Sequence, residues 1–170
     1  MLSVTKDTLP AASLLRAYQQ RGHYTDCYQA EVDRAVFLAE YIRAFYTTPL
    51  FRMERAILAR AVSKPSTDGE ADELAQGSAE SFAAWHVEAR DTNQLLMCDF
   101  RGQTRSWLMI EATATRTRLF FGSAVMLTET TKDAGSRMPL AYVALLPFHK
   151  LYSRALLSSA RRKLVSSAAP

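Results

Sequence analysis

Cysteine and histidine are scarce in this chain. Its two cysteines, Cys27 and Cys98, lie far apart and form no CxxC pair. This usage favours the reducing cytoplasm over a disulfide framework. The three histidines, His23, His86 and His149, show no HxxxH or HxH spacing, and a metal site needs three or four convergent ligands. We therefore expect no metal and no cofactor.

Long apolar runs are also missing. No stretch approaches the ~20 apolar residues that a membrane-spanning helix requires. Lys6 and Asp7 fall where the hydrophobic region of a signal peptide would lie. The expectation is a cytoplasmic protein without integral membrane association.

Acidic residues are absent from residues 134–170. The basic residues of that segment are Arg137, Lys150, Arg154, Arg161, Arg162 and Lys163. The rest of the chain is slightly acidic, although the formal net charge is +4. No standard nucleic-acid-binding signature accompanies the basic segment. We predict no nucleic-acid partner and interpret the cations as one helix face, because the last turn of a helix favours positive charge.

The composition that remains is that of a globular domain. Hydrophobic residues make up 48% and charged residues 22% of the 170 residues, which is enough chain to bury a stable core. We expect one domain over 1–170. Residues 1–23 would form an N-terminal helical extension, 24–165 the core and 166–170 a tail.

The periodicity predicts a strand, two helices and then more strands. "YTDCYQAEV", residues 24–32, reads as a first strand. Two helices joined by a tight corner follow, because Pro49 can start a second helix after the first one ends. The apolar stripe of the first helix comprises Phe37, Leu38, Tyr41, Ile42 and Phe45. From Ser81 onward a period of two predicts an antiparallel meander over 82–90, 94–100, 105–113 and 117–128.

The central strands of this meander are apolar on both faces. A Gly102–Gln103 turn would pair Cys98 with Trp107 and Met97 with Leu108. One face then holds Leu95, Met97, Leu108 and Ile110, and the other Leu96, Cys98, Trp107 and Met109. An antiparallel sheet of this kind must be covered on both faces by helix, ligand or partner subunit. The glycine of "FFGSAV", Gly122, predicts a bulge or close packing in the last strand.

The segment "LLPFHKLYSRALLSSARRKL", residues 145–164, predicts an amphipathic helix that packs across the sheet. Its expected apolar side comprises Leu145, Phe148, Leu151, Tyr152, Ala155 and Leu156. Its expected polar side comprises Lys150, Arg154, Ser158 and Arg161. Pro147 should begin or kink this helix.

This order of elements defines an α+β fold: an antiparallel sheet packed on a long C-terminal helix, with a helix pair after the first strand. Over about residues 24–165 it resembles the helix-grip fold of the START-like, polyketide-cyclase-like (SRPBCC) superfamily. "YTDCYQAEV", "RTRLFFGSAV" and "LAYVALLPFHKLYSRALL" are similar to segments of an uncharacterised bacterial family in that superfamily. The resemblance implies a cavity between sheet and last helix that receives apolar molecules. With about five strands expected where the superfamily often has six or seven, that cavity would be small or filled.

Three hypotheses follow for the function. The leading one is non-catalytic binding of an apolar or amphipathic small molecule, because an apolar cavity with few polar groups is the default ligand site. The expected ligand-binding residues are Phe45, Met97, Trp107, Phe121, Phe148, Tyr152 and Arg105. Phe148 and Tyr152 would act as gates, and His149 or Arg105 would orient a polar head group. The second hypothesis is an enzyme, which the next paragraph describes. The third is a homodimeric interaction protein without a cavity.

The enzyme hypothesis, of the cyclase or hydratase type, depends on three candidates. His86 and Glu88 alternate onto one predicted strand face with Arg90, and a histidine–carboxylate pair can move protons. His149 would be an acid or base at the cavity mouth. The alternatives are ion pairing on a solvated strand face for His86 and Glu88, and a bond to a backbone carbonyl near the helix start for His149. No nucleophile motif or phosphate-binding loop is present.

Overall fold

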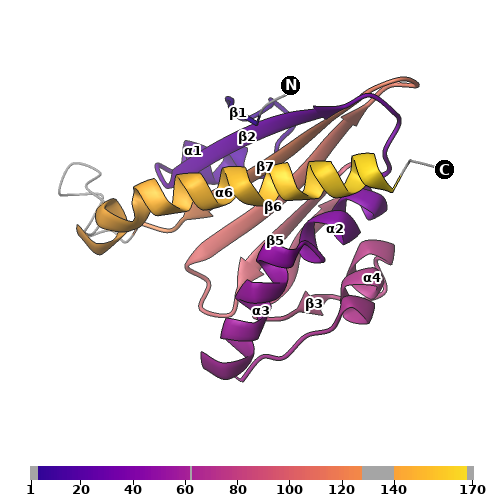
Figure 1. Ribbon diagram of the computed structural model, residues 1–170. Coiled ribbons are helices and arrows are strands. Elements are labelled where there is room, and N and C mark those ends of the chain that lie inside the picture. Colours follow the sequence, from indigo (N-terminus) through magenta and orange to yellow (C-terminus); the bar gives the residue numbers. More distant parts are fainter. Residues whose placement is uncertain (1–3, 62, 128–139, 168–170) are drawn as a thin grey trace.

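The computed structural model describes residues 4–61, 63–127 and 140–167 (Figure 1). The strands are β1 (Thr5–Lys6), β2 (Tyr24–Val32), β3 (Ser81–Phe82), β4 (Trp85–Asp91), β5 (Gln94–Asp99), β6 (Thr104–Ala112) and β7 (Thr117–Val125). The helices are α1 (Arg16–Gln20), α2 (Leu38–Tyr46), α3 (Pro49–Ala61), α4 (Asp68–Gln76) and α6 (Leu140–Ser166). None of these helices is long and apolar enough to cross a bilayer.

All strands form one antiparallel sheet in the order β1-β2-β7-β6-β5-β4-β3. The long helix α6 crosses one face of this sheet, with α2 and α3 beside it (Figure 1). The predicted α+β, helix-grip-like arrangement is confirmed, including the helix pair after the first long strand. The expected number of strands was too low, because two-residue strands β1 and β3 extend the two edges.

Each face of the sheet has its own core. On the α6 face, Leu95, Met97 and Leu108 pack with the buried side chains of α2 and α6. On the opposite face, Leu96 and Trp107 pack with residues of the N-terminal segment. Both apolar faces are therefore covered within the chain, because the segment before β2 folds over the second one.

The predicted faces of β5 and β6 are correct, but the predicted register is wrong by two residues. Cys98 pairs with Arg105 and Met97 pairs with Ser106. The two strands are joined by a longer loop because the Asp99 carboxylate accepts hydrogen bonds from the backbone N–H groups of Gln103 (2.7 Å) and Thr104 (2.9 Å). A shift of two residues leaves every side chain on its predicted face.

A β-bulge at Glu88 interrupts the alternation of β4. Val87 pairs with Met97 and Ala89 with Leu96, so Glu88 has no partner across the ladder. The bulge moves Arg90 to the α6 face, where its guanidinium donates to the backbone oxygen of Leu74 (2.6 Å). The predicted common face holds for His86 and Glu88, which both lie away from α6. It is wrong for Arg90, because the extra residue of the bulge reverses the side-chain direction after Glu88.

The buried stripe of α6 is rotated from the predicted one. Phe148 and Leu151 are 67% and 69% exposed. The buried side chains are Ser153, Leu156, Leu157, Ala160 and Leu164. These recur at i, i+3, i+4, i+7 and i+11, which is one face of a straight helix. Pro147 lies inside α6, and the side chain of Leu145 lies outside the described part of the structure.

The first helix of the pair begins one residue later than its apolar pattern suggested. Phe37 is 76% exposed at the N-cap position of α2, where its N–H donates to the Glu40 carboxylate (2.9 Å). Tyr41, Ile42 and Phe45 are fully buried. The predicted stripe is therefore confirmed from Leu38 onward, and Phe37 does not belong to it.

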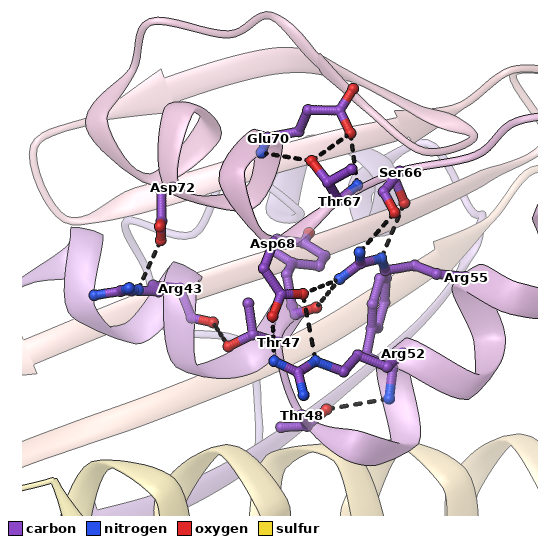
Figure 2. Close-up of polar contacts among 12 residues, drawn as sticks. Arg43, Thr47, Thr48, Arg52, Arg55, Ser66, Thr67, Asp68, Glu70 and Asp72 are labelled. Carbon is purple, nitrogen blue, oxygen red and sulfur yellow. Dashed lines mark hydrogen bonds and ion pairs between the residues drawn. The ribbon is translucent and has the colours of Figure 1, made fainter.

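The helix α3 is anchored to the start of α4 by Arg55. This arginine is buried and donates to the Asp68 carboxylate (2.7 Å), to Ser66 Oγ (2.9 Å) and to the Ser66 carbonyl (2.7 Å) (Figure 2). Asp68 also pairs with Arg52, and Thr67 and Glu70 form a capping box at the N-terminus of α4. Burying a guanidinium is tolerated only when its donors are satisfied. These bonds therefore fix the position of α3 relative to the start of α4.

Gly122 lies in β7 where the chain packs tightly. A Cβ there would lie 2.7 Å from the Asp26 carbonyl oxygen and 2.9 Å from both Leu15 Cδ1 and Trp107 Cε3. The ladders on both sides of β7 run through Gly122 without a shift. Of the two predicted roles for this glycine, close packing is correct and a bulge is not.

We expect Gly122→Ala to lower the free energy of unfolding by ~1–3 kcal/mol, because the added methyl group meets backbone on one side and a packed ring on the other. Chemical denaturation measures this. The matched control is Gly69→Ala in α4, where the Cβ would make an ordinary 3.7 Å contact with Thr67 Oγ1. Alanine there should be neutral or stabilise by up to ~1 kcal/mol. Equal effects of the two variants would contradict this packing.

A second prediction follows from which side chains of α6 are buried. Leu157→Ala should destabilise the protein by ~2–5 kcal/mol, since the side chain is fully buried. Leu151→Ala on the exposed side should change the free energy of unfolding by no more than ~0.5 kcal/mol. Thermal and chemical melts of both variants test the orientation of the helix. A larger loss at Leu151 than at Leu157 would show that the helix is rotated.

Candidate functional site

A pocket of about 370 Å³ lies between the sheet, α3 and the first described side chains of α6. Phe51 and Glu54 of α3 line one side, and side chains of α6 line another: Leu146, Phe148, His149, Tyr152, Ser153 and Leu156. The base comes from the start of β6 and the end of β7. This volume is within the range of small-molecule sites.

The inner wall of the pocket is aromatic. The ring centroids of Phe45 and Phe121 lie 4.8 Å apart, and those of Phe45 and Phe51 lie 6.1 Å apart. Phe45, Phe51 and Phe121 are buried, and Trp85 is half-buried beside them. The arrangement supplies apolar contact area from four different elements, α2, α3, β4 and β7.

The structure brings most of the sequence-predicted ligand-binding residues together. Phe45, Phe121, Phe148, Tyr152 and Arg105 all contribute to the lining. The rings of Phe148 and Tyr152 stack at 5.9 Å with an interplanar angle of 11°. Phe148 is mostly exposed and Tyr152 half-buried, so this stacked pair lies where the pocket meets solvent.

Two of the predicted ligand-binding residues lie elsewhere. Met97 is fully buried in the core of the α6 face but does not line the pocket. Trp107 lies on the opposite face of the sheet, where its Nε1–H donates to Gln94 Oε1 (3.0 Å). Trp107 is separated from the pocket by the sheet itself.

Arg105 lines the pocket, but its guanidinium is engaged on the other side of the sheet. Its Nε donates to Glu88 Oε2 (2.7 Å) and to the hydroxyl of Tyr18 (3.2 Å). A further nitrogen donates to the carbonyl of Gly102 (2.7 Å). The predicted role of Arg105 in orienting a head group has no geometric support, because its charge is already paired.

His86 and Glu88 do not enter the pocket. His86 is exposed and pairs across the ladder with Cys98 on the side of the sheet away from α6. Glu88 binds Arg105 and Tyr18 there. Since neither group reaches the cavity, this pair cannot act on a molecule bound in it.

His149 instead meets a buried carboxylate that sequence reasoning did not identify. Its Nε2 lies 2.9 Å from Asp26 Oδ2 and 2.9 Å from Ser123 Oγ. Ser123 donates its hydroxyl (2.6 Å) and its backbone N–H (3.0 Å) to Asp26 Oδ1. Asp26 of β2, Ser123 of β7 and His149 of α6 thus form one polar cluster at the edge of the pocket.

This cluster does not have the geometry of a nucleophilic triad. In such a triad the serine and the carboxylate engage opposite nitrogens of the imidazole. Here the same nitrogen of His149 faces both groups, and the hydroxyl proton of Ser123 points to Asp26. The serine is therefore not activated, and the cluster ties α6 to the sheet.

The hydrogen bonds also determine the ionisation of Asp26. Burial alone raises the pKa of this carboxyl, but the hydrogen bonds from His149 and Ser123 outweigh it and hold the pKa below its ordinary value. Asp26 is 5% exposed. A buried carboxylate with several donors remains ionised at neutral pH.

Glu54 and Tyr152 form a second polar contact across the pocket. The Tyr152 hydroxyl of α6 donates to Glu54 Oε2 of α3. Burial raises the pKa of the Glu54 carboxyl, and the bond from Tyr152 offsets only part of this effect. Burial and the neighbouring Glu54 also raise the pKa of Tyr152 far above its ordinary value, so it stays a neutral donor.

Ser153 places an unsatisfied hydroxyl on the pocket wall. It is 1% exposed, lines the pocket, and its Oγ has no hydrogen-bond partner among the described residues. Leaving a buried hydroxyl unpaired costs ~1–3 kcal/mol. A bound molecule with a polar group would remove this cost.

Sequence reasoning missed Asp26, Glu54, Ser123 and Ser153. The available signal for Asp26 was its position inside the apolar strand "YTDCYQAEV", where a charged side chain on a buried face calls for a partner. Ser123 and Ser153 have no such signal, because serine is common on solvated surfaces. Within the described residues, no group of three or more His, Cys, Asp or Glu side chains is placed to hold a metal ion.

In comparisons with protein-family models, with curated proteins and with solved structures, no match to this chain was found.

The lowered pKa of Asp26 predicts acid sensitivity. The pKa of Asp26 is lower in the folded protein than in the unfolded chain. The ionised carboxylate therefore stabilises the fold above about pH 4, and this stabilisation is lost as the pH falls through the folded pKa. Asp26→Asn should lower the free energy of unfolding by ~1–3 kcal/mol at pH 7, and its deficit against the wild type should shrink below about pH 4. Urea denaturation between pH 7 and pH 3 tests this. A deficit that is constant across that range would contradict the ionised carboxylate.

Proposed function

We propose that this protein binds an apolar or amphipathic small molecule in the pocket between its sheet and α6, without carrying out chemistry on it. The observation that supports the proposal most strongly is a pocket of about 370 Å³ whose wall combines buried aromatic rings with the Ser153 hydroxyl, which is unpartnered among the described residues. Most pockets that hold small molecules combine a largely apolar wall with a few polar groups.

The energetics favour an apolar occupant. Each Å² of apolar surface removed from water contributes ~25 cal/mol, reduced by the cost of immobilising the ligand. The rings of Phe45, Phe51 and Phe121 are already ordered by their mutual contacts. Binding would therefore need little further ordering of the inner wall.

We propose that the protein does not catalyse a reaction because neither candidate imidazole can act on a molecule in the pocket. His149 is committed to Asp26 and Ser123, and His86 is on the opposite face of the sheet. The cyclase or hydratase alternative would require one of these imidazoles to be free to exchange a proton with the ligand. We also propose a relationship to the START-like superfamily, supported by the helix-grip-like arrangement and by the quoted segments.

Filling the pocket should abolish binding. In Ser153→Phe the new ring enters the space from α6, so the affinity for the neutral apolar dye N-phenyl-1-naphthylamine should fall by at least about tenfold. The control is Ser158→Phe on the same helix, at a half-buried position outside the lining. Dye fluorescence titrations, with a thermal melt of each variant, provide the measurement. If a folded Ser153→Phe binds the dye as the wild type does, the pocket is not the site.

A further inference from the structure

We propose that the ligand of this pocket presents a hydrogen-bond donor, with an amine as its strongest form, and that Glu54 accepts it, so that carboxylate ligands are disfavoured. The inference rests on the proposed function and narrows it to neutral or amine-bearing apolar molecules. Three features of the described lining carry the argument: its charges, the unused oxygen of Glu54 and the hydroxyl of Ser153.

The charges of the described lining leave no cation for an anionic ligand. The guanidinium of Arg105 is paired with Glu88 on the other face of the sheet. His149 is held by the Asp26 carboxylate. Glu54 remains as the one carboxylate of the described lining that no cation pairs with. A carboxylate placed in this pocket would lose its hydration without gaining a countercharge, which is strongly unfavourable.

The carboxylate of Glu54 has a hydrogen-bond partner on only one of its two oxygens among the described residues. Its Oε2 accepts from Tyr152, whereas Oε1 has no hydrogen-bond partner among the described residues. The α3 backbone beside it is anchored, because the next residue, Arg55, donates to Ser66 and Asp68 (Figure 2). A carboxylate that is held in place and partly dehydrated binds an ammonium group more strongly than one in water.

Ser153 gives an independent indication of a polar ligand atom. Its buried hydroxyl lines the same pocket, one residue after Tyr152 on α6, and is unpartnered among the described residues. A hydroxyl can both accept from and donate to a ligand group. Amines and alcohols can both hydrogen-bond a hydroxyl and donate to a carboxylate oxygen, so we expect both to bind, the amine more tightly.

The test uses three probes with one apolar body: 4-phenylbutylamine, 4-phenylbutanol and 4-phenylbutyrate. Isothermal titration calorimetry at pH 7 should rank the amine first, the alcohol second and the carboxylate last. We expect at least about a tenfold difference between amine and carboxylate, which corresponds to ~1.4 kcal/mol. Glu54→Gln, which keeps the shape and removes the charge, should reduce amine affinity by about tenfold and change alcohol affinity by less than about threefold.

Two further variants make the result interpretable. Glu73→Gln removes an exposed carboxylate of α4 and should leave all three affinities unchanged. Tyr152→Phe removes the phenol that binds Glu54 but keeps the ring and the carboxylate, so the preference for the amine should persist even if Glu54→Gln does not fold.

The outcomes separate the two proposals. Equal affinities for the three probes, tightest binding of 4-phenylbutyrate, or an amine preference that survives Glu54→Gln would overturn the role of Glu54 and leave a general apolar pocket. Failure of all three probes and of N-phenyl-1-naphthylamine to bind would overturn the proposed function itself.

Discussion

The ionised carboxylate of Asp26, buried inside the sheet, constrains the rest of the structure. Such a group is stable only when donors surround it, and here they come from β7 and from His149 of α6. The early part of α6 is thus held to the sheet by a polar side chain, and Tyr152 holds it to α3 in the same way. Further along, Leu156 and Leu157 pack directly into the core. The pocket lies beside these polar contacts, along the part of α6 that precedes Leu157.

Both faces of the sheet are apolar, and how each face is covered determines which elements surround the pocket. The N-terminal segment covers the face that carries Leu96 and Trp107, so α2, α3 and α6 all remain for the other face (Figure 1). There α3 is held by the network around Arg55 (Figure 2), which places Phe51 and Glu54 at the pocket. The aromatic wall and the acceptor oxygen therefore come from an element whose position is set outside the pocket.

Local sequence patterns predicted the elements and faces well but not the long-range polar contacts. Alternation is a property of neighbouring residues, and it correctly assigned Met97 and Leu108 to one face. The register failed because the Asp99 carboxylate stabilises a longer loop, which periodicity does not report. The apolar stripe of α6 was misassigned because exposed Phe148 and Leu151 follow the same helical spacing as core residues. The contact between Asp26 and His149 joins residues 123 positions apart, so only the fold reveals it.

The proposed function requires a small molecule to occupy the space between β7 and α6. Amide chemical-shift mapping by NMR, with 4-phenylbutanol added to the isotope-labelled protein, tests it most directly. We expect the largest shifts at Phe121–Val125 of β7 and His149–Leu156 of α6, and no response at Arg16–Gln20 on the opposite face of the sheet. Shifts centred on Arg16–Gln20, or no shifts at millimolar probe, would contradict it.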